Sequence, residues 1–162
     1  AIYSARLAVR QINAAGGIAG HRLALVALDD RGDVELARQA AASLVIDPAV
    51  VAVVGHYVSA TTSAAESIYA QGGLPLLPMG TSPFSPVDPA GLPVEFQEAY
   101  AAATPFDEIA GPFAGPTFDA FGLLREALAV AEESTGDISR ASVQEALGGL
   151  KYQGLTGEVY QP

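Results

Sequence analysis

The stretch Val50–Pro83, VVAVVGHYVSATTSAAESIYAQGGLPLLPMGTSP, decides the fold of this chain. It opens with the apolar run Val50–Val54, whose length and β-branched residues predict a strand buried on both faces. Ser59 then stands where it can cap a helix, and the pair Gly72–Gly73 ends that helix. A second short apolar strand follows at Leu74–Leu77. The pattern predicts a strand–helix–strand unit with polar loops at the carboxyl ends of both strands.

Those two loops are the predicted ligand site, because ligands of open α/β sheets bind beyond the carboxyl ends of the strands. A helix that begins at Ser59 points its first N–H groups and the positive end of its dipole at this edge. Thr61 adds a hydroxyl, and the Gly80 backbone and Ser82 face them from the next loop. None of these groups carries a full charge, so they suit a carboxylate better than a polyphosphate. A second interpretation stays open, in which Ser59 only caps its helix and the loop only turns the chain.

Composition excludes several classes of partner. The chain has 162 residues, the length of one domain, with eighteen acidic and eight basic residues and a formal net charge of −10. Clustered Lys and Arg are needed to bind phosphate backbones, so nucleic acid and anionic membrane surfaces are not expected as partners. No apolar run approaches the roughly 18 residues of a membrane span. Without cysteine, disulfides and thiolate metal sites are excluded. No signal peptide is recognised, because AIYSARLAVRQ looks like a helix from within a domain.

The residues before Val50 continue the alternation of helices and strands. Apolar spacing predicts a helix over residues 1–15, followed by a strand at Leu23–Leu28. Asp33 is expected to cap a helix that runs to Ile46. Alternating helices and strands predict an α/β fold: a three-layer, open, mostly parallel sheet with helices on both faces.

The pattern changes after residue 82. Four prolines mark residues 83–93 as a linker. Helices are predicted from Pro93 to Tyr100, over Thr117–Glu133, and from Ser139 to Leu147. The tail alternates enough at Glu158–Tyr160 to predict a strand.

Two segments of the chain resemble a known family. The run LAVRQINAAGGIAGHRLALVALDDRGDVELARQAAASLV, together with the Val50–Pro83 stretch, is similar to the first lobe of type I periplasmic solute-binding proteins. The leucine/isoleucine/valine-binding receptors of ABC importers are the most similar subgroup. Residues 96–160 are similar to the C-terminal helices that return to that lobe. The resemblance therefore implies a single Rossmann-like lobe over residues 1–162, built from 1–82 and 93–162 and joined by 83–93, where the second lobe is missing.

The resemblance also implies site residues and a function. In this family a Ser at the helix start and a loop of small residues hold the carboxylate and ammonium groups of an amino acid. His56 is expected to orient the loop, and Tyr57 either offers its ring to the ligand or is an ordinary packed side chain. The candidate ligand-binding residues are His56, Tyr57, Ser59, Thr61, Gly80, Thr81 and Ser82. The implied protein is an extracytoplasmic binding module without enzymatic activity or cofactor, with an amino acid or related carboxylate as ligand and an ABC permease as partner.

The chain also departs from the family pattern. It begins at the first helix, so the family's first strand, expected between the Leu23 and Val50 strands, is missing. The tail strand, a partner chain or a rearranged strand order is expected to fill that place. Because an unpaired apolar edge favours self-association, a homodimer is expected.

Three other functions compete with ligand binding. Asp29–Asp30 resembles the acidic pair of a phosphorylated receiver domain, but Val54 is followed by Gly-His instead of an acceptor Asp, and the only lysine is Lys151. Neither His21 nor His56 belongs to a nucleophile elbow or to a zinc-binding spacing, which argues against a hydrolase. The main rival to ligand binding is a single-lobe structural or dimerisation module with a vestigial cleft.

Overall fold

The computed structural model describes residues 1–160 of the chain. In chain order the elements are α1 (Ile2–Ala14), α2 (Val34–Ile46), β1 (Val53–Val54), α3 (Ser59–Gln71), β2 (Leu76–Leu77), the 3₁₀ turn η1 (Pro89–Gly91), α4 (Val94–Ala103), α5 (Ala114–Thr135), α6 (Arg140–Leu147), β3 (Lys151–Gly154) and β4 (Gly157–Tyr160).

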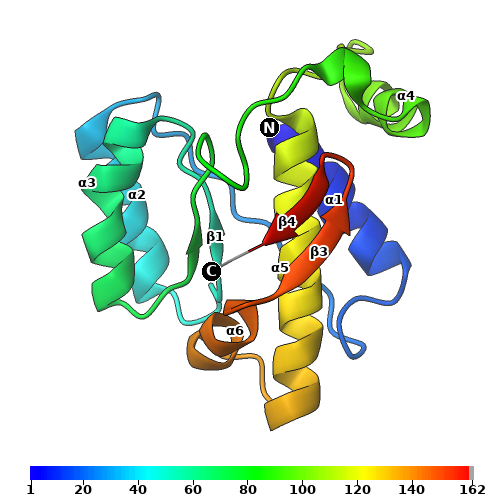
Figure 1. Ribbon diagram of the computed structural model, residues 1–162. Coiled ribbons are helices and arrows are strands. Elements are labelled where there is room, and N and C mark those ends of the chain that lie inside the picture. Colours follow the sequence, from blue (N-terminus) through cyan, green and yellow to red (C-terminus); the bar gives the residue numbers. More distant parts are fainter. Residues whose placement is uncertain (161–162) are drawn as a thin grey trace.

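The elements lie in three layers, as Figure 1 shows. Helices α2 and α3 pack against each other on one side, the parallel pair β1–β2 lies in the middle, and α1 packs on α5 on the other side. The main apolar core lies between the central strands, α5, α6 and β4. Its largest fully buried side chains are Leu77, Phe84, Leu123, Leu128, Val143 and Val159. The predicted α/β class with helices on both faces is confirmed.

Local sequence signals set the ends of the helices. The Asp33 carboxylate accepts a hydrogen bond from the Leu36 N–H at 2.9 Å and caps α2. Ser139 and Ser142 form a reciprocal capping box at the start of α6. Gly136 ends α5 with a φ of +68°, a conformation that glycine adopts without strain. The predicted helices are present, and α5 extends beyond the expected bounds at both ends.

The strands are shorter than predicted. Only two residues from each of the runs Val50–Val54 and Leu74–Leu77 take part in strand pairing. Val53 lies opposite Leu76, and Val54 lies opposite Leu77. Val50–Val54 is half-buried, so the expectation of a strand buried on both faces is wrong. Length and composition indicate an apolar strand, but its paired extent depends on neighbours far away in the sequence.

The predicted strand Leu23–Leu28 is an extended segment without a strand partner among residues 1–160. Leu23 and Leu25 pack toward α1 and Phe121. On the alternate positions Val26 is 57% exposed and Leu28 is 52% exposed. Burial alternates from Leu23 to Val26, as in a strand with one covered face, but the segment lacks the ladder that would make it a strand.

The tail does not complete the central sheet, contrary to one of the expectations. β4 pairs antiparallel with β3, with Tyr152 opposite Val159, and forms a separate hairpin. The fully buried Asp119 of α5 anchors the turn of this hairpin: its carboxylate accepts hydrogen bonds from the Leu155 and Thr156 N–H groups at 2.7 and 2.8 Å. The short connection between β3 and β4 makes this local pairing favourable.

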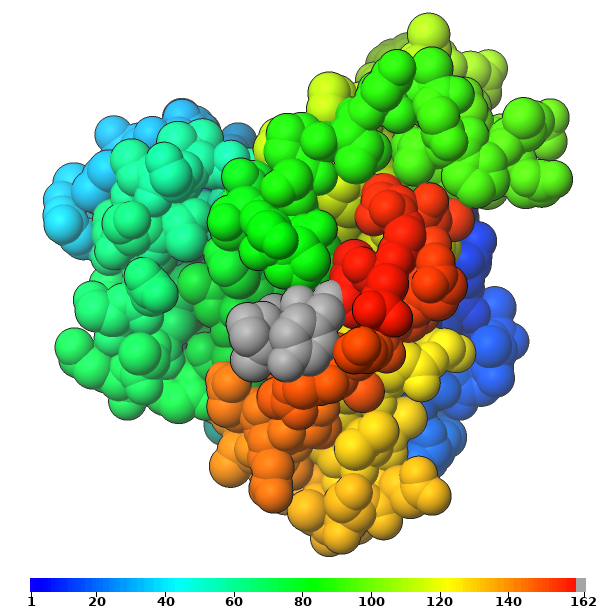
Figure 2. Space-filling model, viewed as in Figure 1, coloured from blue at the N-terminus to red at the C-terminus, as the bar shows by residue number. Residues whose placement is uncertain are grey.

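Residues 83–93 connect the central strands to α4 without an α-helix or a strand, as predicted. Phe84 of this segment is nevertheless fully buried in the main core. Helix α4 packs through Phe96 and Tyr100 against Leu7 of α1 in a second apolar cluster. Figure 2 shows this region projecting from the rest of the molecule at the upper right.

The guanidinium of Arg140 joins three segments of the chain. It donates hydrogen bonds to the carbonyl oxygens of Leu44, Val45, Asp47, Val50 and Gly72, at distances from 2.6 to 3.3 Å. These carbonyls lie at the end of α2, before β1 and at the end of α3, where helical carbonyls have no intrahelical partner. A single side chain therefore fixes α6 to the α2–α3 layer.

Candidate functional site

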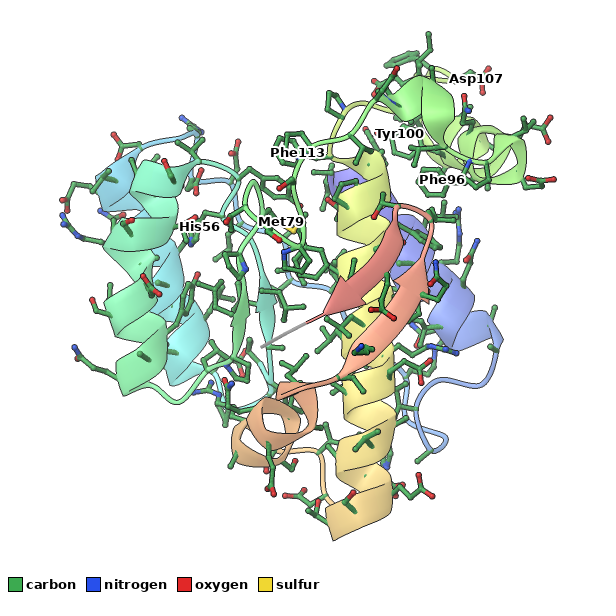
Figure 3. The ribbon with its side chains drawn as sticks, viewed as in Figure 1. His56, Met79, Phe96, Tyr100, Asp107 and Phe113 are labelled. Carbon is green, nitrogen blue, oxygen red and sulfur yellow. The ribbon has the colours of Figure 1, made fainter. Side chains whose placement is uncertain are left out.

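The candidate site lies at the carboxyl ends of β1 and β2, where two loops touch. The Met79 N–H donates a hydrogen bond to the His56 carbonyl oxygen at 3.2 Å. Gly80 has a φ of +82°, and a Cβ there would come within 3.2 Å of the Tyr57 carbonyl oxygen. Figure 3 shows His56, Met79 and Phe113 together at this edge. The predicted juxtaposition of the 56–59 loop and the 80s loop is therefore present for His56, Tyr57 and Gly80.

His56 is the centre of a buried polar network. Its side chain is 8% exposed; Nδ1 pairs with the Asp30 carboxylate, and Nε2 is 3.1 Å from the Tyr69 hydroxyl. Asp30 also accepts a hydrogen bond from the Gly32 N–H at 2.8 Å. The network ties the end of the extended segment, the loop after β1 and the middle of α3. His56 thus holds its loop through a side chain that points away from solvent.

The electrostatics of the network follow from burial and charge. Partial burial of Asp30 opposes its ionisation, but the hydrogen bonds from His56 and Gly32 outweigh this effect and lower the pKa of Asp30. Burial, reinforced by the nearby Asp30 charge, raises the pKa of Tyr69 to about 12. At neutral pH the Asp30 carboxylate is therefore charged and the Tyr69 phenol keeps its proton.

Tyr57 is held by α5. Its hydroxyl is 3.0 Å from the Thr117 Oγ1, and its ring packs edge-on against Phe113 with centroids 5.2 Å apart. Burial raises the pKa of Tyr57, although the Thr117 hydrogen bond opposes this shift. The ring forms part of the wall between the 80s loop and α5.

The start of α3 differs from the prediction at Ser59. The N-cap residue is Val58, whose side chain has no capping oxygen, and Ser59 is the first helical residue. Thr61 is fully buried and its hydroxyl donates to the Val58 carbonyl oxygen at 2.8 Å, so this group is engaged inside the helix start. The helix therefore begins one residue earlier than predicted. Val58, whose backbone is extended with φ −120° and ψ 129°, takes the N-cap position instead of Ser59.

The remaining candidate hydroxyls are open to solvent. Ser59, Thr81 and Ser82 are all exposed, and none of their hydroxyls has a hydrogen-bond partner among residues 1–160. Within that part of the chain no group of three His, Asp or Glu side chains is placed to hold a metal ion. The site offers hydroxyls and helix N–H groups.

Sequence reasoning missed three residues that shape this site. The sequence singles out Asp30 only for its resemblance to the acidic pair of a receiver domain, and it does not single out Tyr69 or Thr117. The available signal was the position of Asp30 at the carboxyl end of an apolar extended run, the edge at which His56 follows the next run. Tyr69 and Thr117 carry no such signal, because their roles arise from contacts across the fold.

The central strand pair, the helices on both faces and the polar loops at one edge define a lobe of the kind found in solute-binding proteins. Residues 1–94 match the sequence model of the family described as "Periplasmic binding protein". The chain therefore belongs to the periplasmic binding protein family.

Curated relatives agree over the first half of the chain. An amino acid binding protein of Pseudomonas aeruginosa is 39% identical over 77 residues, which cover 47% of this chain and 21% of that protein. The Leu/Ile/Val-binding protein of Escherichia coli K12 is 39% identical over 80 residues, which cover 49% of this chain and 22% of that protein. The matched part thus spans about a fifth of these relatives. The resemblance to branched-chain amino-acid receptors is confirmed.

Solved structures extend the likeness of the fold to nearly the whole chain. The substrate-binding protein LivJ of Streptococcus pneumoniae, solved with isoleucine, has a TM-score of 0.77 at 15% identity, over 96% of this chain and 84% of its own. An ABC transporter substrate-binding protein of Desulfitobacterium hafniense, solved with leucine, has a TM-score of 0.74 at 16% identity. The match covers 97% of this chain and 87% of that protein's chain. The relatives named here are solute-binding proteins. In the described part of this chain, no helix combines the length and the apolarity needed to cross a bilayer.

Proposed function

We propose that this chain is the ligand-binding lobe of an extracytoplasmic receptor for an ABC importer, and that it holds the carboxylate of an amino acid at the start of α3. The observation that carries the proposal is the α3 N-terminus, which has no side-chain cap and lies beside the Gly80 loop. The relatives are amino-acid receptors, and two related structures contain isoleucine or leucine.

The chemistry of the edge suits such a ligand. The first N–H groups of α3 and the helix dipole attract an anion, and Ser59 adds a hydroxyl donor. Thr81 and Ser82 face solvent on the neighbouring loop and supply further hydroxyls, while Gly80 lets that loop approach the Tyr57 backbone. In the proposal His56 and Tyr57 shape the two loops, and Thr61 fixes the helix start.

The expected affinity of one lobe is low. A receptor of micromolar affinity has about −8 kcal/mol of binding free energy, and half of that corresponds to a dissociation constant of about 1 mM. We propose that the lobe comprises residues 1–82 and 93–162 and that the second lobe of the relatives belongs at 83–93. Closure of two lobes on the ligand is the event to which the importer permease responds in this proposal.

Titration with leucine, isoleucine and valine, followed by ¹H–¹⁵N NMR, tests the site. The amides of residues 59–61 and 80–82 are expected to shift, with half-saturation at about 1 mM. Leucinol, which lacks the carboxylate, is expected to leave them unmoved. Ser59→Ala is expected to weaken binding by about tenfold or more, because a hydrogen bond to a charged group contributes about 1.5–3 kcal/mol. Ser63→Ala, an exposed serine one turn further along α3, is the matched control.

The site assignment fails if these amides do not move up to roughly 50 mM amino acid, some fifty times the expected dissociation constant. A second candidate function, a structural dimerisation module, is favoured by one observation. Val26 and Leu28 expose 57% and 52% of their surface on a segment without a strand partner. A tight dimer in the absence of any amino acid, with no ligand response, supports that alternative.

A further inference from the structure

A groove of about 520 Å³ lies between α1 and residues 22–25, on the opposite side of the central strands from α3. Its lining residues are Arg6, Val9, Arg10, Asn13, Ala14, Arg22 and Leu25. The two walls are fixed to each other through Asn13. The Asn13 side chain donates to the Leu23 carbonyl oxygen at 2.9 Å and accepts from the Leu23 N–H at 2.7 Å. The groove therefore has a defined shape even though the extended segment lacks a strand partner.

The groove gathers positive charge in an acidic chain. It holds three of the eight basic residues of a chain whose net charge is −10. Within residues 1–160, the salt bridges do not involve Arg6, Arg10 or Arg22. Arg6 also lies over the Tyr3 ring, 5.7 Å from its centroid, which restricts the orientation of the guanidinium. Three cations without acidic partners repel one another unless an anion joins them.

The lining indicates the chemistry of that anion. Guanidinium groups bind phosphate and carboxylate through two parallel N–H donors, so three of them suit an oxyanion with more than one negative charge. Val9 and Leu25 add apolar surface against which a short carbon skeleton can pack. A volume near 520 Å³ falls in the range of small-molecule sites.

Charge also decides between a small ion and a large anionic partner. At physiological salt the Debye length is about 8 Å, so an ion that fits inside the groove is influenced mainly by the arginines. An anionic membrane or a long acidic segment extends beyond that distance and meets the remaining acidic surface of the chain. We propose that the Arg6–Arg10–Arg22 groove is a binding site for a small, multiply charged oxyanion of the organic phosphate or polycarboxylate class.

Pyrophosphate and citrate are suitable probes, added to the full chain at constant ionic strength. Both are expected to shift the amides of residues 6–14 and 22–25 and the side-chain Nε–H signals of the three arginines, and to raise the thermal unfolding midpoint. Arg10→Gln is expected to weaken binding about fivefold, which is typical of a partly exposed ion pair in a multidentate site. The double substitution Arg6→Gln/Arg10→Gln is expected to remove the thermal shift.

Arg38→Gln is the matched control, because Arg38 lies on α2 and pairs with Glu35 outside the groove. The affinity of this variant for pyrophosphate and citrate is expected to stay within about twofold of that of the unchanged chain. Equal responses of the unchanged chain and the double variant would show general screening and overturn the proposal. Binding to phosphatidylglycerol vesicles without a response to either free ion would also overturn it. The arginine Nε–H signals of the unchanged chain give a readout that does not depend on how the variants fold.

Discussion

His56 makes four contacts that shape the candidate site. Its side chain pairs with Asp30 and Tyr69, while its carbonyl oxygen accepts from the Met79 N–H and, at 3.4 Å, from the Thr62 hydroxyl. Tyr69 is 1% exposed, so its protonated hydroxyl needs an acceptor. The His56 Nε2 supplies that acceptor if Nδ1 carries the proton shared with Asp30. This arrangement satisfies every buried polar group of the network.

The lowered pKa of Asp30 leads to a prediction about pH. A carboxylate whose pKa is lower in the folded protein stabilises the fold above its unfolded pKa of about 3.9, and this contribution is lost as the pH falls through the folded value. Asp30→Asn is expected to lower the free energy of unfolding by about 1–3 kcal/mol at pH 7. The difference between the two proteins is expected to narrow only below about pH 4.

Urea unfolding of both proteins from pH 7 to pH 3 measures this effect. Asp29→Asn is the control, because Asp29 is exposed and, among the described residues 1–160, accepts only from the Arg31 N–H in its own turn. A difference that already disappears near pH 6 would contradict the role given to the ionised Asp30.

At this scale the sequence allowed only part of the site to be predicted. His56 and Gly80 could be placed at the same edge because each follows an apolar run of similar type. The role of Ser59 as helix cap could not be predicted correctly, because the φ and ψ of Val58 decide where α3 begins. The partnership of His56 with Tyr69 depends on how far α3 rotates when it packs, which its own sequence does not specify.

Among the elements, α2 and α3 depend on close packing and on Arg140. A Cβ at Gly72 would lie 2.4 Å from the Val45 side chain, so a glycine lets the ends of the two helices approach. Arg140 then satisfies the carbonyl groups at those ends. Helix ends could be predicted from Asp33, Gly72 and Ser139, because capping is local. The hydrogen bonds of Arg140 to these carbonyl groups could not be predicted, since the partners are more than 60 residues away in the sequence.

Arg140→Gln is expected to destabilise the protein by about 2–4 kcal/mol, because it leaves several half-buried carbonyl groups without their charged donor. The α2–α3 layer is expected to lose hydrogen-exchange protection more than α5 does. Urea unfolding and amide exchange measure the two effects. Arg125→Gln is the control, since the exposed Arg125 forms an ion pair with its neighbour Glu126 and with no other residue of the described part of the chain. A change below about 0.5 kcal/mol would show that water replaces the guanidinium without cost.

At the scale of the whole molecule, the alternation of helices and apolar runs was enough to predict the class of fold. The alternation was not enough to predict which strands pair, because the neighbours of residues 22–30 and of β3 are set by contacts with residues far away in the sequence. The paired central sheet is therefore small, and the extended segment presents Val26 and Leu28 to solvent. Such an apolar edge favours association between copies.

We therefore expect the chain to dimerise in a concentration-dependent manner through residues 22–30. Val26→Lys/Leu28→Lys is expected to weaken the dimer at least tenfold, since buried lysines at an edge oppose strand pairing. Sedimentation velocity over a range of concentrations measures this. Val94→Lys, at an exposed position of α4, is the matched control. If the control and the double variant associate equally, the interface lies elsewhere.

The hydrogen bonds from Arg140 to the ends of α2 and α3 have a consequence for biosynthesis. The ribosome adds about 5–20 residues each second, so Leu44 and Arg140 are made about 5–20 s apart. During that interval the first helical layer exists without the side chain that later holds its ends. The order of translation therefore makes the final assembly of the N-terminal half dependent on the C-terminal half.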